Sequence, residues 1–562
     1  MAIDSNNTPN QTTTPPAVFV EKLSFRYRSL DDEPQPKRKR SVPETETIEL
    51  PLTLEDISFS LPAGKLMLIA GPSGCGKSTL IKCLNGLIPH SYKGTLSGEI
   101  QLHGRSIIGQ SLRDLALQVG TMLQDPDKQI LGSTVEQEIA FGMENLGTQR
   151  EVMRERIASV LNHLHLEHYQ GQATFALSGG QRQQVAAAGL VVMQPSIFLF
   201  DEPFANLDSQ AVDELEKLIQ QLLQKGSTVI IIEHRVEEAL RLKPDRVLLM
   251  RDGRQIFFGE TQEFLELADP TQVKLPIEST LRRLSDPSQA RSLLIRPIIT
   301  RQENKEDTDE HILEFENVNF QYNTFSEEIL HGISFHAKRG ETIALLGPNG
   351  SGKTTLVKQA LGLLRPTKGT VRIYGKDTHN LSVAELASSI GYVFQSPSAM
   401  LFAPSVQKEV SFGPENLRFK PEYIKAVVRE AEEALNVAEF DVRSPFSLSF
   451  GQQKRVAIAS VLAMKGKILL LDEPTAGQDY RSYIAFMEYL RNMPDLDVLL
   501  IITHDIDLAL RFTQRVLLLK EGNLVGDGSP LDVLADPTLL VECNLRRTSL
   551  LHYLLTERNA VA

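Results

Sequence analysis

The stretch Gly71-Pro72-Ser73-Gly74-Cys75-Gly76-Lys77-Ser78-Thr79 decides the fold of this chain. Its spacing is that of a phosphate-binding loop, in which glycines let consecutive backbone N–H groups turn inward around an anion. Lys77 is placed to reach the β- and γ-phosphates of a nucleotide, and the Ser78 hydroxyl to hold Mg²⁺. The apolar run 66–70 predicts a buried parallel strand before the loop, and residues 80–87 predict a helix after it.

A second loop of the same pattern, Gly-Pro-Asn-Gly-Ser-Gly-Lys-Thr-Thr at residues 347–355, follows the apolar run 342–346. A glycine-rich turn with a chance lysine is the alternative for either loop alone, but the strand and helix context of both favours phosphate binding. Other motifs recur at a fixed offset of 271 positions, among them Gln124 with Gln395 and Asp201 with Asp472. The sequence therefore predicts an internal duplication and two nucleotide sites.

The composition limits the classes of function. At 562 residues the chain is too long for a single core. Its 71 acidic and 59 basic residues give a formal net charge of −12, and the only polybasic run is Lys-Arg-Lys-Arg at 37–40, so nucleic-acid binding is poorly supported. The three cysteines lack metal-like spacing, which favours a reduced compartment. The longest apolar runs stop well short of the roughly 18 residues that a membrane span needs.

The domain organisation follows from the repeat. We expect a disordered lead at 1–16, a first domain at 17–295, a charged linker at 296–311 and a second domain at 312–562. The repeat also extends past the nucleotide core, because Ala-Asp-Pro-Thr at 268–271 returns at 535–538. Each half is therefore expected to carry a small helical C-terminal appendage.

Two acid pairs, Asp201-Glu202 and Asp472-Glu473, each end a fully apolar strand. A strand that is apolar on both faces is central and parallel, and its carboxyl end is where α/β sheets place ligands. The aspartates can hold Mg²⁺, and the glutamates can polarise an attacking water. A pair of solvated turn acids is the alternative, but both pairs lie at the same distance behind a phosphate loop.

A third motif, Leu-Ser-Gly-Gly-Gln at 177–181, opens a helix and offers another N-terminus that faces anions. One half cannot place two phosphate-binding helix ends on the same γ-phosphate. The second copy at 448–452 reads Leu-Ser-Phe-Gly-Gln.

These motifs resemble those of the ATP-binding-cassette (ABC) ATPases over almost the whole chain, twice. The resemblance implies an α/β fold of two phosphate-loop (ABC) domains in tandem. Each domain would have a mixed or parallel sheet core, an antiparallel β subdomain, a helical subdomain and the appendage. It further implies hydrolysis of ATP with Mg²⁺, and an intramolecular dimer in which the signature helix of each half covers the nucleotide held by the other.

The resemblance also implies roles for individual residues, with the rings of Tyr27 and Tyr322 stacked on adenine and the two histidines beside the γ-phosphate. The catalytic residues would be Glu202, His234, Glu473 and His504. The metal ligands would be Ser78, Gln124, Asp201, Thr354, Gln395 and Asp472. The nucleotide-binding residues would be Tyr27, Gly71, Ser73, Gly74, Gly76, Lys77, Ser78, Thr79, Tyr322, Gly347, Asn349, Gly350, Gly352, Lys353, Thr354, Thr355, Ser178, Gly179, Gly180, Gln181, Ser449, Phe450, Gly451, Gln452, Asp208 and Asp479.

Phe450 departs from the family pattern, which has glycine at this position. A side chain where backbone approaches phosphate should impede closure over the nucleotide. Because signatures act across the interface, the hypothesis is that the Lys77/Glu202 site is slower than the Lys353/Glu473 site. The alternative is that Phe450 points away from the nucleotide.

Within the family, Gln-Asp-Pro-Asp-Lys-Gln at 124–129 resembles a segment of the energy-coupling-factor importer ATPases. There it lines a groove that grips a helix of a transmembrane coupling subunit. The second half has Ser-Ala-Met at 398–400 instead, so we expect its groove to differ. The implied partners are the coupling subunit and a substrate-binding membrane subunit, at the cytoplasmic face of the membrane. The transported compound, by resemblance a vitamin or vitamin precursor, would not touch the ATPase.

Three alternatives stay open. A tandem cassette that acts on ribosomes typically has a long basic linker, whereas residues 260–310 contain more acids than bases. The segment 126–129 argues against a sugar-type importer. The sequence distinguishes an exporter ATPase from an importer ATPase only weakly. The three histidines between 163 and 168 are interpreted as part of a solvated helix, because the equivalent segment 434–439 contains none.

Overall fold

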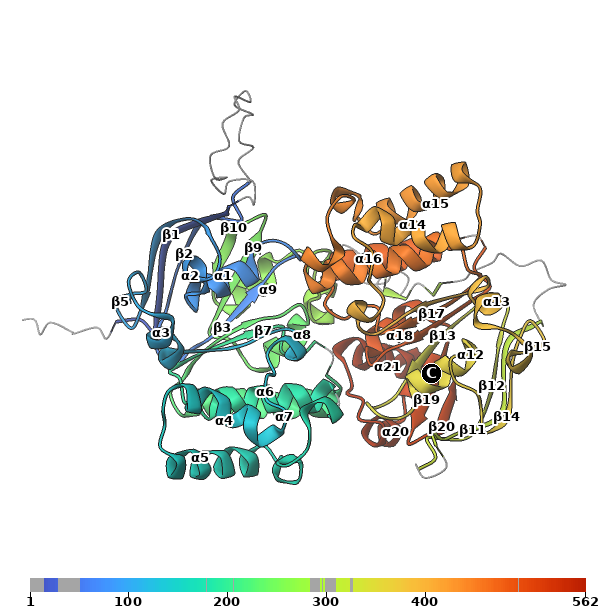
Figure 1. Ribbon diagram of the computed structural model, residues 1–562, viewed down its shortest axis with the longest axis horizontal. Coiled ribbons are helices and arrows are strands. Elements are labelled where there is room, and N and C mark those ends of the chain that lie inside the picture. The colour runs from blue at the N-terminus through green and yellow to red at the C-terminus, as the bar shows by residue number, and fades with distance from the viewer. Residues whose placement is uncertain are drawn as a thin grey trace, which may run out of the picture. The chain divides into compact units, whose positions relative to one another are not determined.

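A computed structural model of the chain describes residues 15–28, 51–177, 179–205, 207–283, 294–295, 297–298, 310–323, 327–493 and 495–561. They form two compact units, one of Met1–Pro203 with Leu215–Leu267 and one of Phe204–Glu214 with Ala268–Ala562 (Figure 1). Most of the expected lead 1–16 and linker 296–311, together with Ser178, lies outside the described residues. The domain bounds 17–295 and 312–562 stay predictions.

The first unit is organised on a ten-stranded sheet with the order β5-β4-β1-β2-β10-β9-β3-β8-β7-β6. Strands β3, β7 and β8 are buried at every residue and pair in parallel. Burial on both faces explains why their sequences are continuously apolar. The strands are β1 (Val18–Tyr27), β2 (Leu54–Leu61), β3 (Leu66–Ala70), β4 (Gly94–Leu102), β5 (Arg105–Ser106), β6 (Val119–Met122), β7 (Ile197–Asp201), β8 (Thr228–Ile232), β9 (Arg246–Arg251) and β10 (Arg254–Gly259).

The helices of the first repeat are α1 (Lys77–Leu84), α2 (Leu87–His90), α3 (Leu112–Gln118), α4 (Val135–Asn145), α5 (Arg150–His163), α6 (Gly179–Val191), α7 (Ser209–Gln224), α8 (Val236–Arg241) and α9 (Thr261–Leu267). The predicted helix 80–87 starts earlier, at Lys77, because the phosphate loop runs directly into it through Gly76 (φ 100°). Helices α4, α5 and α6 pack on one another around an apolar cluster of their own (Figure 1). They form the predicted helical subdomain.

The second unit contains two sheets, a six-stranded one with the order β16-β17-β18-β13-β19-β20 and a four-stranded one with the order β12-β11-β14-β15. The six-stranded sheet is parallel except at its edge strand β20, and the four-stranded sheet is antiparallel. The strands are β11 (His311–Phe320), β12 (Leu330–Lys338), β13 (Glu341–Leu346), β14 (Lys368–Ile373), β15 (Lys376–Asp377), β16 (Ile390–Val393), β17 (Ile468–Asp472), β18 (Val498–Ile502), β19 (Arg515–Lys520) and β20 (Asn523–Gly528).

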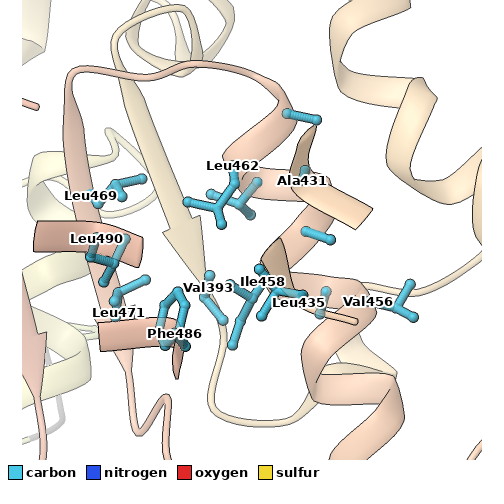
Figure 2. Close-up of a cluster of buried hydrophobic side chains, with 14 of the residues drawn as sticks. Val393, Ala431, Leu435, Val456, Ile458, Leu462, Leu469, Leu471, Phe486 and Leu490 are labelled. Carbon is cyan, nitrogen blue, oxygen red and sulfur yellow. The ribbon is translucent and has the colours of Figure 1, made fainter. Parts of the chain in front are cut away.

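The helices that follow Leu267 are α10 (Ile277–Leu281), α12 (Lys353–Ala360), α13 (Val383–Ala387), α14 (Val406–Asn416), α15 (Pro421–Ala434), α16 (Phe450–Ala463), α17 (Tyr480–Arg491), α18 (Ile506–Phe512), α19 (Pro530–Leu534), α20 (Pro537–Glu542) and α21 (Ser549–Val561). Helix α16 packs against α14 and α15. Figure 2 shows the core beneath it, where Ile458 and Leu462 of α16 lie beside Leu469 and Leu471 of β17. The helical segment is thereby joined to the strand that carries the second acid pair.

In the part of the chain that the structure describes, no helix combines the length and the apolar character needed to cross a membrane.

Candidate nucleotide-binding sites

The first phosphate loop runs from the end of β3 into α1 and holds a buried lysine. Lys77 Nζ donates to the carbonyl oxygens of Gly71 (2.9 Å) and Pro72 (2.8 Å). Gly71 has φ 148°, and a Cβ atom there would lie 2.2 Å from the Met250 carbonyl oxygen. Only glycine fits this close approach of two backbone segments.

The second loop repeats this geometry. Lys353 Nζ donates to the carbonyl oxygens of Gly347 (2.8 Å) and Pro348 (2.7 Å), and a Cβ atom at Gly347 would lie 2.0 Å from the Leu519 carbonyl oxygen. Burial lowers the pKa of Lys353, although the charges of Glu473 and Asp472 oppose that shift. An ammonium has three donors, and the loop uses two of them at each site, so an anion at the loop would both accept a bond and offset the cost of burial.

The first acid pair is also buried. Asp201 ends β7, and burial, together with the charge of Glu202, raises its pKa to about 6 against the opposing hydrogen bond from Ser78. The Asp201 Oδ1 atom is buried and has no hydrogen-bond partner in the described part of the chain. An orphaned carboxylate oxygen beside a serine hydroxyl is what an oxygen-loving cation requires.

Two predicted residues contact the carboxylate of Glu202. Gln124 Nε2 donates to Glu202 Oε2 (2.6 Å), and His234 Nε2 lies 3.1 Å from Glu202 Oε1. The backbone of Glu202 is held in the left-handed region at φ 50°, with its N–H donated to the Ile232 carbonyl (2.9 Å). This turn directs the carboxylate away from the strand and toward the glutamine and the histidine.

The second acid pair has different neighbours. Asp472 Oδ2 accepts from Thr354 Oγ1 (2.8 Å) and from the Tyr392 hydroxyl (3.1 Å). His504 Nδ1 lies 2.9 Å from Glu473 Oε1, and the Thr503 hydroxyl donates to Glu473 Oε2 (3.4 Å). Burial alone would raise the pKa of Glu473, but His504 and the nearby lysines outweigh it, so that pKa is lowered.

Gln395 is the predicted residue that the structure does not bring to its acid pair. It follows β16, its side chain is exposed, and among the described residues it makes no hydrogen bond to Glu473. The equivalent Gln124 is bonded to Glu202, so the two halves differ here.

The two signature helices begin at equivalent positions. Ser449 caps α16 and forms a capping box with Gln452, while Phe450 is the first helical residue and is half-buried. At the matching residue of α6, Gly179, an added Cβ would have no neighbour within 4 Å. The chain therefore leaves open space in the first half where the second half carries a phenyl ring.

Three of the four aromatic and aspartate residues expected at the nucleotide lie beside the phosphate loops. The hydroxyls of Tyr27 and Tyr322 are 3.2 Å and 3.3 Å from those of Thr79 and Thr355. Within the second unit, Asp208 Oδ2 accepts from the backbone N–H of Asn349 (3.3 Å). Asp479 caps α17 instead, accepting from the backbone N–H of Ser482 (2.9 Å).

Comparison with known proteins agrees with this geometry. A family profile described as ABC transporter matches residues 54–205 and 330–476, more than half of the chain. This chain belongs to the ABC transporter family. It is similar to ABC transporter ATP-binding proteins, so named, of Methanosarcina acetivorans (34% identity over 93% of this chain and 88% of the relative), Vibrio vulnificus (36%, 95% and 93%) and Enterococcus faecalis (37%, 95% and 94%). A solved structure of cbiO1 from Clostridium perfringens, described as part of the ABC transporter complex cbiONQ, shares 36% identity and covers 44% of this chain and 99% of its own, with a TM-score of 0.38.

As an ABC ATPase, the chain is an enzyme that binds and hydrolyses ATP. The residues present fit that ligand, because each phosphate loop ends on a buried lysine and a helix N-terminus that favour negative charge. They also fit Mg²⁺, which Ser78 and Asp201 would hold in the first site and Thr354 and Asp472 in the second. The cation would supply positive charge next to the phosphates.

Three residues near the second acid pair of this ABC ATPase were not expected from its motifs. They are Tyr392, Thr503 and Lys454, where the first half has Thr121, Glu233 and Gln183. The repeat offset exposes these differences, but it does not tell which of them touch the acid pair. Their reach depends on how the helices and strands pack.

Proposed function

We propose that this ABC ATPase is the energy-coupling subunit of an importer of the energy-coupling-factor type. It would work at the cytoplasmic face of the membrane, docked on a transmembrane coupling subunit that in turn contacts a substrate-binding membrane subunit. The cargo class, a vitamin or vitamin precursor, rests on the family resemblance alone, because an ATPase subunit does not contact the cargo.

An apolar groove in the second unit supports this proposal most directly. It has a volume of about 310 Å³ and runs between the sheet and the helices α13, α14 and α16. Two phenyl rings at its rim, Phe402 (57% exposed) and Phe412 (46% exposed), lie edge to face with centroids 4.6 Å apart. Exposed aromatic surface next to a groove is typical of a docking site for another protein.

The groove is connected to the nucleotide site. Phe394 and Met400, which lie on either side of the Gln395 loop, form part of its wall. The backbone N–H of Phe394 also contacts Met400 Sδ (3.3 Å). A helix end that enters the groove would therefore press on the loop that carries Gln395.

The first unit presents a related but unequal surface. Leu131 (69% exposed) and Phe141 (43% exposed) occupy the positions of Phe402 and Phe412 in the repeat. One half thus offers two aromatic rings and the other a leucine and one ring. Unequal surfaces favour a partner that presents two different helix ends.

The catalytic residues of the chain have separable roles in the proposal. Glu473 polarises the attacking water, and His504 holds the carboxylate in place through their 2.9 Å contact. Glu202 and His234 have the same roles in the first site. Pairing of the halves head to tail is supported by Asp208, which follows the first acid pair in the sequence yet bonds to the second phosphate loop.

We also propose that the two sites are unequal. The open space around Gly179 means that its own half does not require glycine there, which favours a ligand as the reason for the missing side chain. Phe450 puts a ring in the equivalent position. The signature with Phe450 would face the nucleotide on Lys77, so that this site is the slower one.

The docking proposal is tested by Phe402→Asp, with Val442→Asp as its matched control, since Val442 is 90% exposed and lies outside the groove. Burial of a carboxylate in an apolar interface is costly, so Phe402→Asp should lower recovery of the membrane subunits in mild detergent by about tenfold or more, while ATP hydrolysis by the isolated chain continues. Undiminished recovery of membrane proteins, or co-purification with ribosomes at moderate salt, would contradict the proposal.

A further inference from the structure

We propose that Lys454 is a positioning residue of the second nucleotide site, which holds the Gln395 loop and the carboxyl end of β17 against the signature helix α16. The inference rests on the proposed roles of Gln395 and Asp472, and it adds a residue that the motifs of the site do not contain.

The bonds of Lys454 connect three separate segments. Its side chain is fully buried, and Nζ donates to the carbonyl oxygens of Phe394 (2.8 Å), Gln395 (2.9 Å) and Asp472 (3.1 Å). An ammonium has three donors, and all three are used here. Two of the acceptors are the backbone carbonyls of Gln395 and Asp472, which are both predicted to hold the metal.

The helix places Lys454 on its buried face. Ile458 and Val461 lie four and seven positions further on and are both buried, so they share a face with Lys454. In Figure 2, Ile458 packs close to Val393 of β16, and Phe394 and Gln395 directly follow that strand. A lysine in this apolar surrounding carries a high cost of desolvation, which the three carbonyls offset. Packing alone would be served better by an apolar side chain.

The first half links its glutamine loop to its acid pair through different residues. Gln183 stands at the equivalent position on α6, and its amide donates to the Pro203 carbonyl, which follows the acid pair. That half instead joins its loop to the acid pair through Gln124 and Glu202. The second half therefore links loop and strand through a cation on the signature helix, and the first half links them through the glutamine itself.

This arrangement lets α16 act on the site directly. Lys454 binds the backbone carbonyl of Gln395, while the Gln395 side chain stays exposed. The lysine therefore determines the backbone position from which that side chain projects. It also fixes the last peptide of β17, from which Asp472 and Glu473 project. A shift of α16 would move both segments together.

The test compares Lys454→Gln, which introduces the residue of the first half, with Lys454→Arg, which keeps a cation. Each is made in the full chain and in the Glu202→Gln chain, and kcat, KM for ATP, affinity for a fluorescent ATP analogue and Tm are measured. Misplacement of reacting groups by about 1 Å can cost about 100-fold in rate. We expect Lys454→Gln to lower kcat by about 10- to 100-fold with KM and analogue affinity within about threefold, and Lys454→Arg to restore most of the rate.

Arg455→Gln is the matched control, because Arg455 is the next residue of α16 and also donates to two carbonyls, those of Leu435 and Asn436. It should lower Tm without lowering kcat. A second control is Gln395→Ala: if Lys454 acts through Gln395, Lys454→Gln should cost much less rate in that chain.

Unchanged kcat in Lys454→Gln, or a loss of rate that Arg455→Gln reproduces, would overturn the inference. So would full additivity with Gln395→Ala together with failure of Lys454→Arg to restore activity. Loss of all hydrolysis in Glu202→Gln alone would instead refute the proposed inequality of the sites, and the comparison in the otherwise unchanged chain would still decide the role of Lys454.

Discussion

The two nucleotide sites have the same phosphate-loop geometry, but the residues that contact their acid pairs differ. Both loops fold a lysine onto the same two loop carbonyls, and both glutamates lie near a histidine. In the first site, however, a glutamine reaches the glutamate, whereas in the second a tyrosine and a threonine support the acids. The comparison teaches that after duplication the ligand-binding backbone was kept, while the side chains that hold the reacting groups diverged.

The largest expected effect comes from removing one catalytic carboxylate at a time. Glu473→Gln should lower ATP hydrolysis by about 10²- to 10⁴-fold, because the water at the faster site loses its polarising group. Glu202→Gln should leave most of the activity. Steady-state phosphate release measures both. Loss of activity in Glu202→Gln with most of it retained in Glu473→Gln would reverse the assignment of the faster site.

The next largest effect is expected from Phe450→Gly, measured in the Glu473→Gln chain so that only the first site contributes. Removal of the ring should let the second signature close on the nucleotide at Lys77 and raise residual hydrolysis by about tenfold, or about 1.4 kcal/mol of barrier. Phe446→Gly is the control, because Phe446 is 57% exposed and lies just before the signature. Equal rates in the two variants would show that Phe450 does not obstruct the site.

The smallest expected effect is a pH dependence of folding stability in the helical part of the second half, which the first half should lack. Burial, with the adjacent charge of Asp441, raises the pKa of Glu432 to about 7, whereas the first half has Leu161 and Gln170 at these positions. The folded state then binds the proton more tightly than the unfolded state, so stability falls as pH rises from about 4.5 to about 7.

Glu432→Gln removes this penalty, so it should raise stability at pH 8 by no more than about 1 kcal/mol, because solvent screens the charge of the carboxylate, and by little at pH 4.5. Thermal unfolding at the two pH values measures it. Glu433→Gln, one residue on, exposed and paired with Arg429, is the control and should show no such pH dependence. A gain that is the same at both pH values would mean that titration of Glu432 is not its cause.

The sequence predicted much of the fold, because strands are marked by apolar runs of neighbouring residues. The strand Leu66–Ala70 is a continuous apolar run, and it has the bounds 66–70 that the sequence predicted. The strand before the second phosphate loop, predicted at 342–346, begins one residue earlier and spans Glu341–Leu346. Boundaries are set by register and turns, which single residues mark weakly.

The supporting residues of the second site could not be predicted in the same way. Lys454 lies within Gln-Gln-Lys-Arg, a stretch that is typical of a solvated helix surface, and only the spacing to Ile458 hints at its burial. Tyr392 lies in a strand whose apolar neighbours make it look like an ordinary core residue. In both cases the polar end finds its partner through contacts between segments that are distant in the sequence.

The backbone turn at the two glutamates has a further consequence for how this chain can change. Glu202 and Glu473 adopt φ values of 50° and 46°, which cost a residue with a side chain about 1–3 kcal/mol. Glycine would adopt this conformation freely, yet it would remove the carboxylate that polarises water. Selection for heat resistance and selection for turnover therefore pull in opposite directions at these two positions, and a library screened only for a higher melting temperature would enrich inactive enzymes.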